Sequence, residues 1–257
     1  MKITILGTGT SVGIPMIACS CPTCSSTDTR DKRLRTSVHI EYKGKNIQID
    51  VGPDFRQQML TSGIQKLDLV LITHQHSDHT AGIDEIRAFN FAHNGSEIPL
   101  FANEFVIKDL KTRFHYIFGA NEYPGLPLIQ LNEIVENQLI DCKEFQIIPI
   151  KIQHGKLNIL GYRIQNFAYI TDASFISEES FEQLQNLEIL IINSLRLKEH
   201  HSHFNLEQSL MAISKIGAKK SYITHLSHQM GLHSNVEKIL PHGVSLAYDG
   251  LVLECNA

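Results

Sequence analysis

The chain has 257 residues, of which 42% are hydrophobic and 19% charged, and its formal net charge is −4. This length suits one large domain with a single core, so we expect one domain over residues 1–257. The charge argues against broad electrostatic capture of nucleic acid, which needs a basic stripe. No apolar stretch reaches the roughly 20 residues that cross a bilayer. The apolar part of residues 1–7 is too short and too soon followed by glycine for a signal peptide, and we expect a first strand there. We therefore expect a cytoplasmic protein without a membrane partner.

Apolar periodicity predicts the elements in chain order. Strands are expected over 3–6, 37–42 and 46–50, the last two as a hairpin, followed by a helix over 53–60. A strand over 67–72 precedes helices over 83–91 and 103–114. Further strands are expected near 139 and over 144–150, 161–164, 168–171, 189–192 and 221–224, with helices over 178–184, 206–216 and 236–240. A closing hairpin joins 245–248 to 251–254. Two series of strands with interspersed helices predict an α/β fold of two helix-covered sheets, a four-layer αββα sandwich.

The segment His74-Gln75-His76-Ser77-Asp78-His79 follows directly after the apolar strand over 67–72. A His-x-His turn aims two imidazoles at one point, and Asp78 and His79 reach a second point close by. This pattern indicates a two-metal site, in which cations about 3.5–4 Å apart clamp a reacting phosphoryl or acyl oxygen. The alternative is a solvated histidine-rich loop that binds metal only by accident.

Three further ligand types stand where apolar strands end: His154, Asp172 and His225. A lone histidine in such a place is more often structural than a ligand. Three candidates in the same local context favour a shared site at one sheet edge. In this order the chain resembles the metallo-β-lactamase fold hydrolases over nearly its whole length.

The resemblance implies a ligand set for each of two metals. One is held by His74, His76 and His154, the other by Asp78, His79 and His225, and Asp172 bridges both. Imidazole and carboxylate ligands admit zinc, manganese or iron, so the two divalent ions stay unidentified.

A loop at 19–24 places the thiols of Cys19, Cys21 and Cys24 close together. In a reducing compartment, clustered cysteines favour a metal site over disulfides. Structural zinc is usually four-coordinate, and His228, three residues after His225, is the candidate fourth ligand. Three reactive or incidental thiols are the alternative.

Several segments together resemble one group within the superfamily, the PhnP-like phosphoribosyl cyclic phosphate phosphodiesterases. They are the early Gly-Thr-Gly run, the cysteine loop, His-x-His-x-Asp-His, Thr-His-x-Ser-His-Gln and the closing Tyr-Asp-Gly. The resemblance implies a structural zinc on the four ligands above, a small phosphodiester substrate and a homodimer. It also implies that His203, in His203-Phe204-Asn205-Leu206, contacts phosphate or protonates the leaving oxygen. His200 and His201 compete for that role, and a solvated histidine cluster is the alternative.

The leading interpretation is a dinuclear phosphodiesterase that cleaves a small, cyclic phosphodiester by attack of a metal-bridging hydroxide. Asp78 and His203 belong to its catalytic machinery. The alternatives are a tRNA 3′-processing endoribonuclease, a thioesterase or other acyl hydrolase on the same fold, and a metal-bound scaffold without turnover. The endoribonucleases usually carry a long basic arm, of which 119–127 is at most a shortened form.

Overall fold

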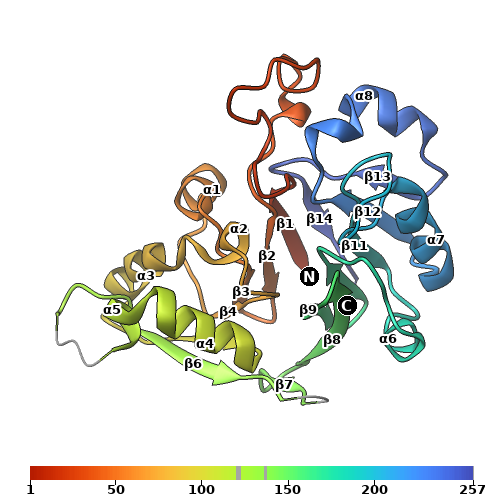
Figure 1. The fold of residues 1–257 in the computed structure, drawn as a ribbon. Coiled ribbons are helices and arrows are strands. Elements are labelled where there is room, and N and C mark those ends of the chain that lie inside the picture. Colours follow the sequence, from red (N-terminus) through yellow and green to blue (C-terminus); the bar gives the residue numbers. More distant parts are fainter. Residues whose placement is uncertain (120–122, 136–137, 257) are drawn as a thin grey trace.

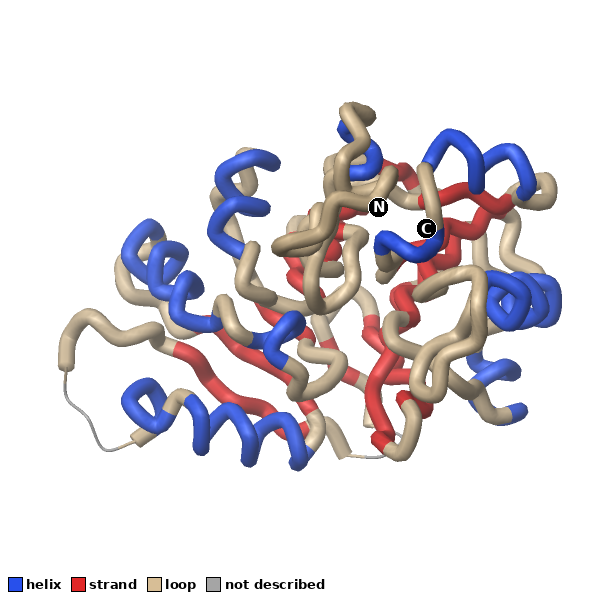
Figure 2. Tube along the Cα trace, turned by 45° about the horizontal axis from the view of Figure 1, so that its top comes forward, coloured by secondary structure: helices blue, strands red, loops and turns tan. Residues whose placement is uncertain are grey.

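Two mixed sheets face each other at the centre of the computed structural model, and helices cover their outer sides (Figure 1). The structure describes residues 1–119, 123–135 and 138–256. Figure 2 shows the strands gathered between two outer groups of helices. The four-layer αββα sandwich predicted from the sequence is therefore confirmed.

The first sheet has the strand order β14-β1-β2-β3-β4-β5-β6. Neighbours from β14 to β3 pair antiparallel, and those from β3 to β6 pair parallel. The strands are β1 (Lys2–Gly7), β2 (Ser37–Tyr42), β3 (Lys45–Ile49), β4 (Leu69–Leu71), β5 (Ile98–Ala102), β6 (Ile129–Glu133) and β14 (Val252–Glu254).

The second sheet has the order β13-β12-β11-β10-β9-β8-β7. Here β10 to β13 pair parallel, and β7 to β10 pair antiparallel. The strands are β7 (Ile140–Asp141), β8 (Gln146–His154), β9 (Leu157–Ile164), β10 (Phe167–Ile170), β11 (Ile189–Asn193), β12 (Lys220–Thr224) and β13 (Val244–Leu246).

Helices α1, α3, α4 and α5 lie outside the first sheet, α6 to α8 lie outside the second, and α2 lies nearer the middle of the molecule (Figure 1). They are α1 (Phe55–Ser62), α2 (Ser77–Thr80), α3 (Arg87–Ala92), α4 (Glu104–Arg113), α5 (His115–Phe118), α6 (Glu178–Gln183), α7 (Leu206–Ile216) and α8 (His233–Val236). Short 3₁₀ turns are η1 (Thr29–Asp31), η2 (Ile83–Ile86), η3 (His228–Met230) and η4 (Glu237–Ile239). None of the helices in the described ranges has the length and apolar character that a membrane crossing requires.

Burial of apolar side chains follows the layers. One cluster fills the space between the sheets and includes Ile5, Ile40, Tyr162 and Tyr169. Two outer clusters pack the first sheet against α1, α3, α4 and α5 and the second against α6 to α8. Strands buried on both faces explain the near-continuous apolar runs in the sequence.

Local signals predict several boundaries well. Helix α7 begins with a capping box, in which Asn205 accepts from Gln208 N and the Gln208 side chain accepts from Asn205 N. It ends at Gly217, whose φ of 69° is a left-handed C-cap. The hairpin of β2 and β3 is also as predicted.

The predicted closing hairpin is wrong. Asp249-Gly250 does reverse the chain, but β13 pairs with β12 in the second sheet and β14 pairs with β1 in the first. The turn therefore carries the chain from one sheet to the other.

Strand direction brings distant segments to one edge. Because β8 and β10 both pair antiparallel with β9, they run the same way, and β12 follows through parallel β11. In the first sheet β3 and β4 also run parallel. Polar residues that follow these strands gather at the carboxyl ends, where sites of α/β folds commonly lie.

Candidate metal centre

The histidine loop emerges from β4 and turns at once into α2. Two of its imidazoles converge, with Nε2 of His74 2.9 Å from Nδ1 of His76. The ring of His154, at the end of β8, lies 5.4 Å and 5.2 Å from theirs, centroid to centroid. One ligand atom from each of these residues and from Asp172 lies within 4.8 Å of the others.

A second cluster lies beside the first and shares one member with it. Its ligand atoms come from Asp78, His79, Asp172 and His225, again all within 4.8 Å of one another. Nε2 of His79 is 3.2 Å from Oδ2 of Asp78, and Nε2 of His225 is 3.6 Å from the same oxygen. All seven residues singled out in the sequence are thus brought together, in the two groups that the resemblance implies.

Asp172 stands between the clusters and presents one carboxylate oxygen to each. Its Oδ1 lies 3.3 Å from Nε2 of His225 and 3.6 Å from Nε2 of His79. Its Oδ2 lies 3.7 Å from Nε2 of His74. Asp172 and His225 both have left-handed backbones, with φ of 58° and 56°. Such conformations cost energy in non-glycine residues and concentrate at functional sites.

Burial sets the charge of the first cluster. It lowers the pKa of His74 well below its ordinary value, with the neighbouring His79 acting in the same direction. It also lowers the pKa of His76 and His154. These imidazoles are therefore neutral at pH 7, which is the form that coordinates a metal.

The second cluster concentrates negative charge. Burial would raise the pKa of Asp172, but His225 and His79 hold it well below its usual range. For Asp78, burial is likewise outweighed, chiefly by His79, and the pKa falls. Burial would lower the pKa of His79, yet the carboxylates of Asp78, Asp50 and Asp172 raise it well above its ordinary value. The site thus favours bound positive charge.

Unpartnered nitrogens show that the residues fit metal ions. Among the described residues, Nε2 of His79 and both ring nitrogens of His225 are buried and make no hydrogen bond. A buried polar atom without a partner costs about 1–3 kcal/mol. Neutral imidazoles and carboxylates are suitable ligands for zinc, manganese or iron, and coordination would satisfy the Nε2 atoms.

Asp50 supports the second cluster from behind, although it is not among the residues predicted from the sequence. The residue follows β3, is fully buried, and its Oδ2 lies 2.7 Å from Nδ1 of His79. It also accepts hydrogen bonds from Thr73 N at 2.9 Å and from the Thr73 hydroxyl. By accepting from Nδ1–H, this carboxylate fixes the His79 tautomer that leaves Nε2 free for a metal. The sequence pattern that could have identified Asp50 is the one that identified His154, Asp172 and His225, namely a polar residue at the end of an apolar strand.

Close packing also fixes the histidine loop. A Cβ added to Gly52 would stand 2.0 Å from the carbonyl oxygen of Asp78, so only glycine fits there. On the other side, Nη2 of Arg113 donates to Gln75 O and to the Thr80 hydroxyl, each at 2.9 Å. The loop is therefore held by α4 as well as by β4.

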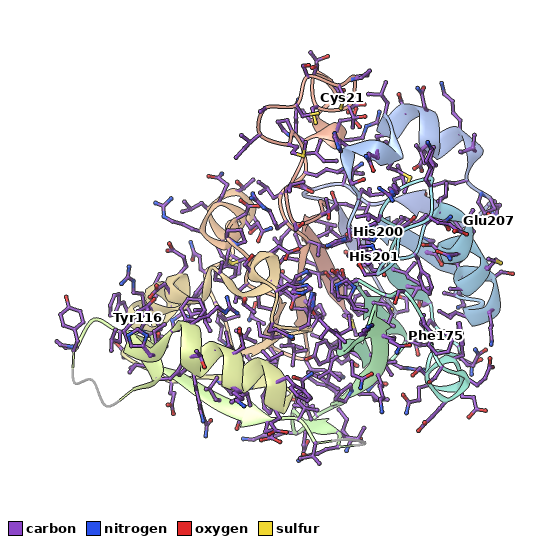
Figure 3. The ribbon with its side chains drawn as sticks, in the orientation of Figure 1. Cys21, Tyr116, Phe175, His200, His201 and Glu207 are labelled. Carbon is purple, nitrogen blue, oxygen red and sulfur yellow. The ribbon has the colours of Figure 1, made fainter. Side chains whose placement is uncertain are left out.

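His203 reaches the centre from the loop before α7. Its Nε2 lies 3.2 Å from Oδ2 of Asp172, on the side of the first cluster, and its side chain is 12% exposed. Its ring is 4.5 Å from that of His154 and 5.1 Å from that of His225. Of the competing candidates, His200 contacts His203, with 3.2 Å between their Nδ1 atoms, and the ring of His201 lies 4.3 Å from that of His200, centroid to centroid. Figure 3 shows His200 and His201 side by side.

The cysteine loop forms a separate cluster with His228. Its three sulfurs lie 3.2, 3.4 and 3.6 Å from Nδ1 of His228, in the order Cys19, Cys21, Cys24. The backbone N–H of Cys24 lowers the pKa of Cys21 to about 6, whereas burial raises that of Cys24 to about 11. Three sulfurs and one imidazole nitrogen match the ligand set of a structural zinc. Cys142 and Cys255 are buried in the core between the sheets.

Comparison with known proteins agrees with the fold. A family model described as "Beta-lactamase superfamily domain" matches residues 45–226. The crystal structure of a diphosphatase from the PhnP family superposes with a TM-score of 0.91 at 41% identity, covering 98% of this chain and 96% of that one. The family predicted from the sequence is confirmed.

Two curated relatives have names of different kinds. An octanoyltransferase of Porphyromonas gingivalis is 42% identical over 253 residues, 98% of this chain and 51% of that protein. A ribonuclease Z of Bradyrhizobium diazoefficiens is 28% identical over 138 residues, 52% of this chain and 45% of that protein. The chain thus spans about half the length of these two relatives.

Proposed function

This chain belongs to the metallo-β-lactamase superfamily and, within it, to the PhnP family, and we propose that it hydrolyses small phosphodiesters with two divalent metal ions. The observation that carries the proposal is the place of Asp172, whose two oxygens face separate ligand clusters while His203 stands beside one of them.

The first cluster would hold one ion through His74, His76 and His154, and the second would hold the other through Asp78, His79 and His225. Asp172 would bridge them. When bound, two such cations supply hydroxide at neutral pH, by lowering the pKa of water from 15.7 to about 7, and offset charge on the phosphoryl oxygens.

The chain's own residues supply orientation and a proton. Asp50 and Ser202 hold the rings of His79 and His154, since Oδ2 of Asp50 and the Ser202 carbonyl lie 2.7 Å and 2.6 Å from their Nδ1 atoms. His203 lies at the edge of the centre, where its Nε2–H would donate to the departing alkoxide. General acid catalysis of this kind typically contributes about 10²–10⁴ in rate.

The similarity to a named diphosphatase makes a phosphoanhydride the second candidate bond. Both reactions are attacks at phosphorus, but they differ in the leaving group. A phosphate that leaves from an anhydride needs less protonation than an alkoxide. The half-buried His200 and the exposed His201 beside His203 would offer ring N–H donors to phosphoryl oxygens in either case.

A substrate panel tests the proposal. It contains a ribose cyclic phosphate, a nucleoside diphosphate, a precursor tRNA and an octanoyl thioester, each assayed with the metal-loaded protein. We expect turnover of the cyclic phosphodiester, which His203→Ala reduces by about 10²–10⁴ without changing metal content. Turnover of the thioester or the tRNA alone would refute the proposal.

A further inference from the structure

The loop that carries His203 follows β11 and ends at the start of α7. Its base is closed by hydrogen bonds from Leu195 N to Phe204 O at 2.9 Å and from Leu206 N to Arg196 O at 3.0 Å. Between these bonds, residues 197–203 have no helix or strand. Individual hydrogen bonds therefore fix their shape, and several of these come from one side chain at the base of the loop.

Arg196 donates these hydrogen bonds from the three nitrogens of its guanidinium group. Nε donates to Lys198 O at 3.2 Å, and Nη2 donates to Glu199 O at 2.7 Å. Nη1 donates to Oε1 of Gln229 at 2.8 Å. Nε and Nη2 thus bind two carbonyls of the loop itself, and Nη1 joins the loop to Gln229 in the segment after β12.

The two segments that Arg196 joins both contain residues of the candidate metal sites or their neighbours. The braced loop continues through His200 to Ser202, whose carbonyl lies 2.6 Å from Nδ1 of His154, and then to His203 beside Asp172. Gln229 directly follows His228, the imidazole of the cysteine cluster. The cysteine loop lies at one end of the molecule, and His200 and His201 lie nearer its centre (Figure 3).

We propose that Arg196 is a positioning residue, which holds the 197–203 loop so that His203 stays at the leaving-group side of the metal centre. The inference rests on the acid role given to His203 under the proposed function. A planar guanidinium can serve three acceptors in fixed directions, whereas a lysine ammonium has no such fork. Without it, the loop keeps its closed base and the bond of Ser202 O to His154, but it loses the bonds to the carbonyls of Lys198 and Glu199.

The reaction is sensitive to such a loss, because displacement of a catalytic group by about 1 Å can reduce the rate about 10²-fold. All seven metal ligands lie outside residues 197–203. The loop touches two of them by hydrogen bonds, through the Ser202 carbonyl to Nδ1 of His154 and through Nε2 of His203 to Asp172. Arg196 should therefore affect proton donation far more than metal binding.

The test compares two phosphodiesters that differ in leaving group, methyl p-nitrophenyl phosphate and methyl phenyl phosphate. p-Nitrophenolate departs without a proton, whereas phenolate is a stronger base and benefits from one. The variants are Arg196→Met and Arg196→Lys, with His203→Ala as the reference. Arg163→Met is the matched control. Arg163 lies on β9 away from the centre, and it also donates to two backbone carbonyls, those of Gln165 and Gln183.

Both Arg196 variants should keep the wild-type metal content and lose about 10–100-fold in kcat/KM on the phenyl ester, with less than about threefold loss on the nitrophenyl ester. His203→Ala should show the same selectivity, and Arg163→Met should match wild type on both. Equal losses on the two esters in the Arg196 variants, with selective loss in His203→Ala, would overturn the inference alone. Absence of selectivity in His203→Ala would refute the acid role and the inference together.

Discussion

Replacement of Asp50 by asparagine should weaken metal binding at the second cluster although the side chain keeps its size. One carboxylate oxygen of Asp50 accepts from Thr73 N at 2.9 Å, and the other lies 2.7 Å from Nδ1 of His79. If the amide oxygen stays with Thr73 N, the amide NH₂ faces His79. An NH₂ group requires a lone pair on Nδ1, which places the ring proton on Nε2, the atom that would bind the metal.

The magnitude follows from the loss of this orienting contact. Substitution of such partners typically reduces metal affinity by about 10–100-fold, equivalent to about 1.4–2.7 kcal/mol. Backbone strain is not a cause, because Asp50 has a φ of 62° and asparagine tolerates that region as well as aspartate. The first cluster should be affected less, since its three histidines do not contact Asp50.

Competition with a chromogenic chelator measures the two affinities separately, and elemental analysis gives ions per chain. Asp68→Asn is the control, because Asp68 accepts from Asn46 N at 2.8 Å at the opposite end of β4. We expect Asp50→Asn to weaken one site only and Asp68→Asn to weaken neither. Two unaltered affinities in Asp50→Asn would refute the tautomer argument.

Three further perturbations test the surroundings of the centre. Burial raises the pKa of Asp249 from 3.8 to about 6, so the folded state binds this proton more tightly and loses up to about 3 kcal/mol of stability as pH rises from about 4 to 7. Asp249→Asn should remove that part of the slope in urea unfolding, and a slope identical to wild type would contradict it. Cys24→Ser removes one of the sulfurs around His228, and we expect one metal ion fewer per chain and a Tm lower by about 5–10 °C; unchanged metal content would argue against a structural zinc. Gly52→Ala places a Cβ 2.0 Å from Asp78 O. We expect it to lower the free energy of unfolding by about 1–3 kcal/mol and to weaken metal binding. An unchanged Tm and an unchanged metal affinity would contradict this expectation.

The ligands of the centre were predictable because each follows an apolar strand that the sequence displays. Asp50 has the same position after β3, yet a lone aspartate after a hairpin strand is common. Its role depends on the parallel pairing of β3 with β4, which places it beside Thr73 and His79. Which strands pair with one another is decided by the tertiary structure, and the local periodicity of the sequence does not predict it.

Two strands of the first sheet were missed for a similar reason. β5 contains Pro99, which lacks the N–H that a central strand normally donates, so its sequence argued against a strand. β6 follows an irregular segment with several Gly and Pro residues; of that segment, 120–122 lie outside the described residues. The turn at Asp249-Gly250 shows the converse, because turn residues predict a reversal but not which sheet each side joins.

The central claim is that Asp172 stands between two ions. Anomalous diffraction from crystals grown with manganese, recorded near its absorption edge, locates such ions directly. We expect two peaks about 3.5–4 Å apart, one beside each carboxylate oxygen of Asp172. A single peak, or density remote from Asp172 at saturating metal, would contradict it.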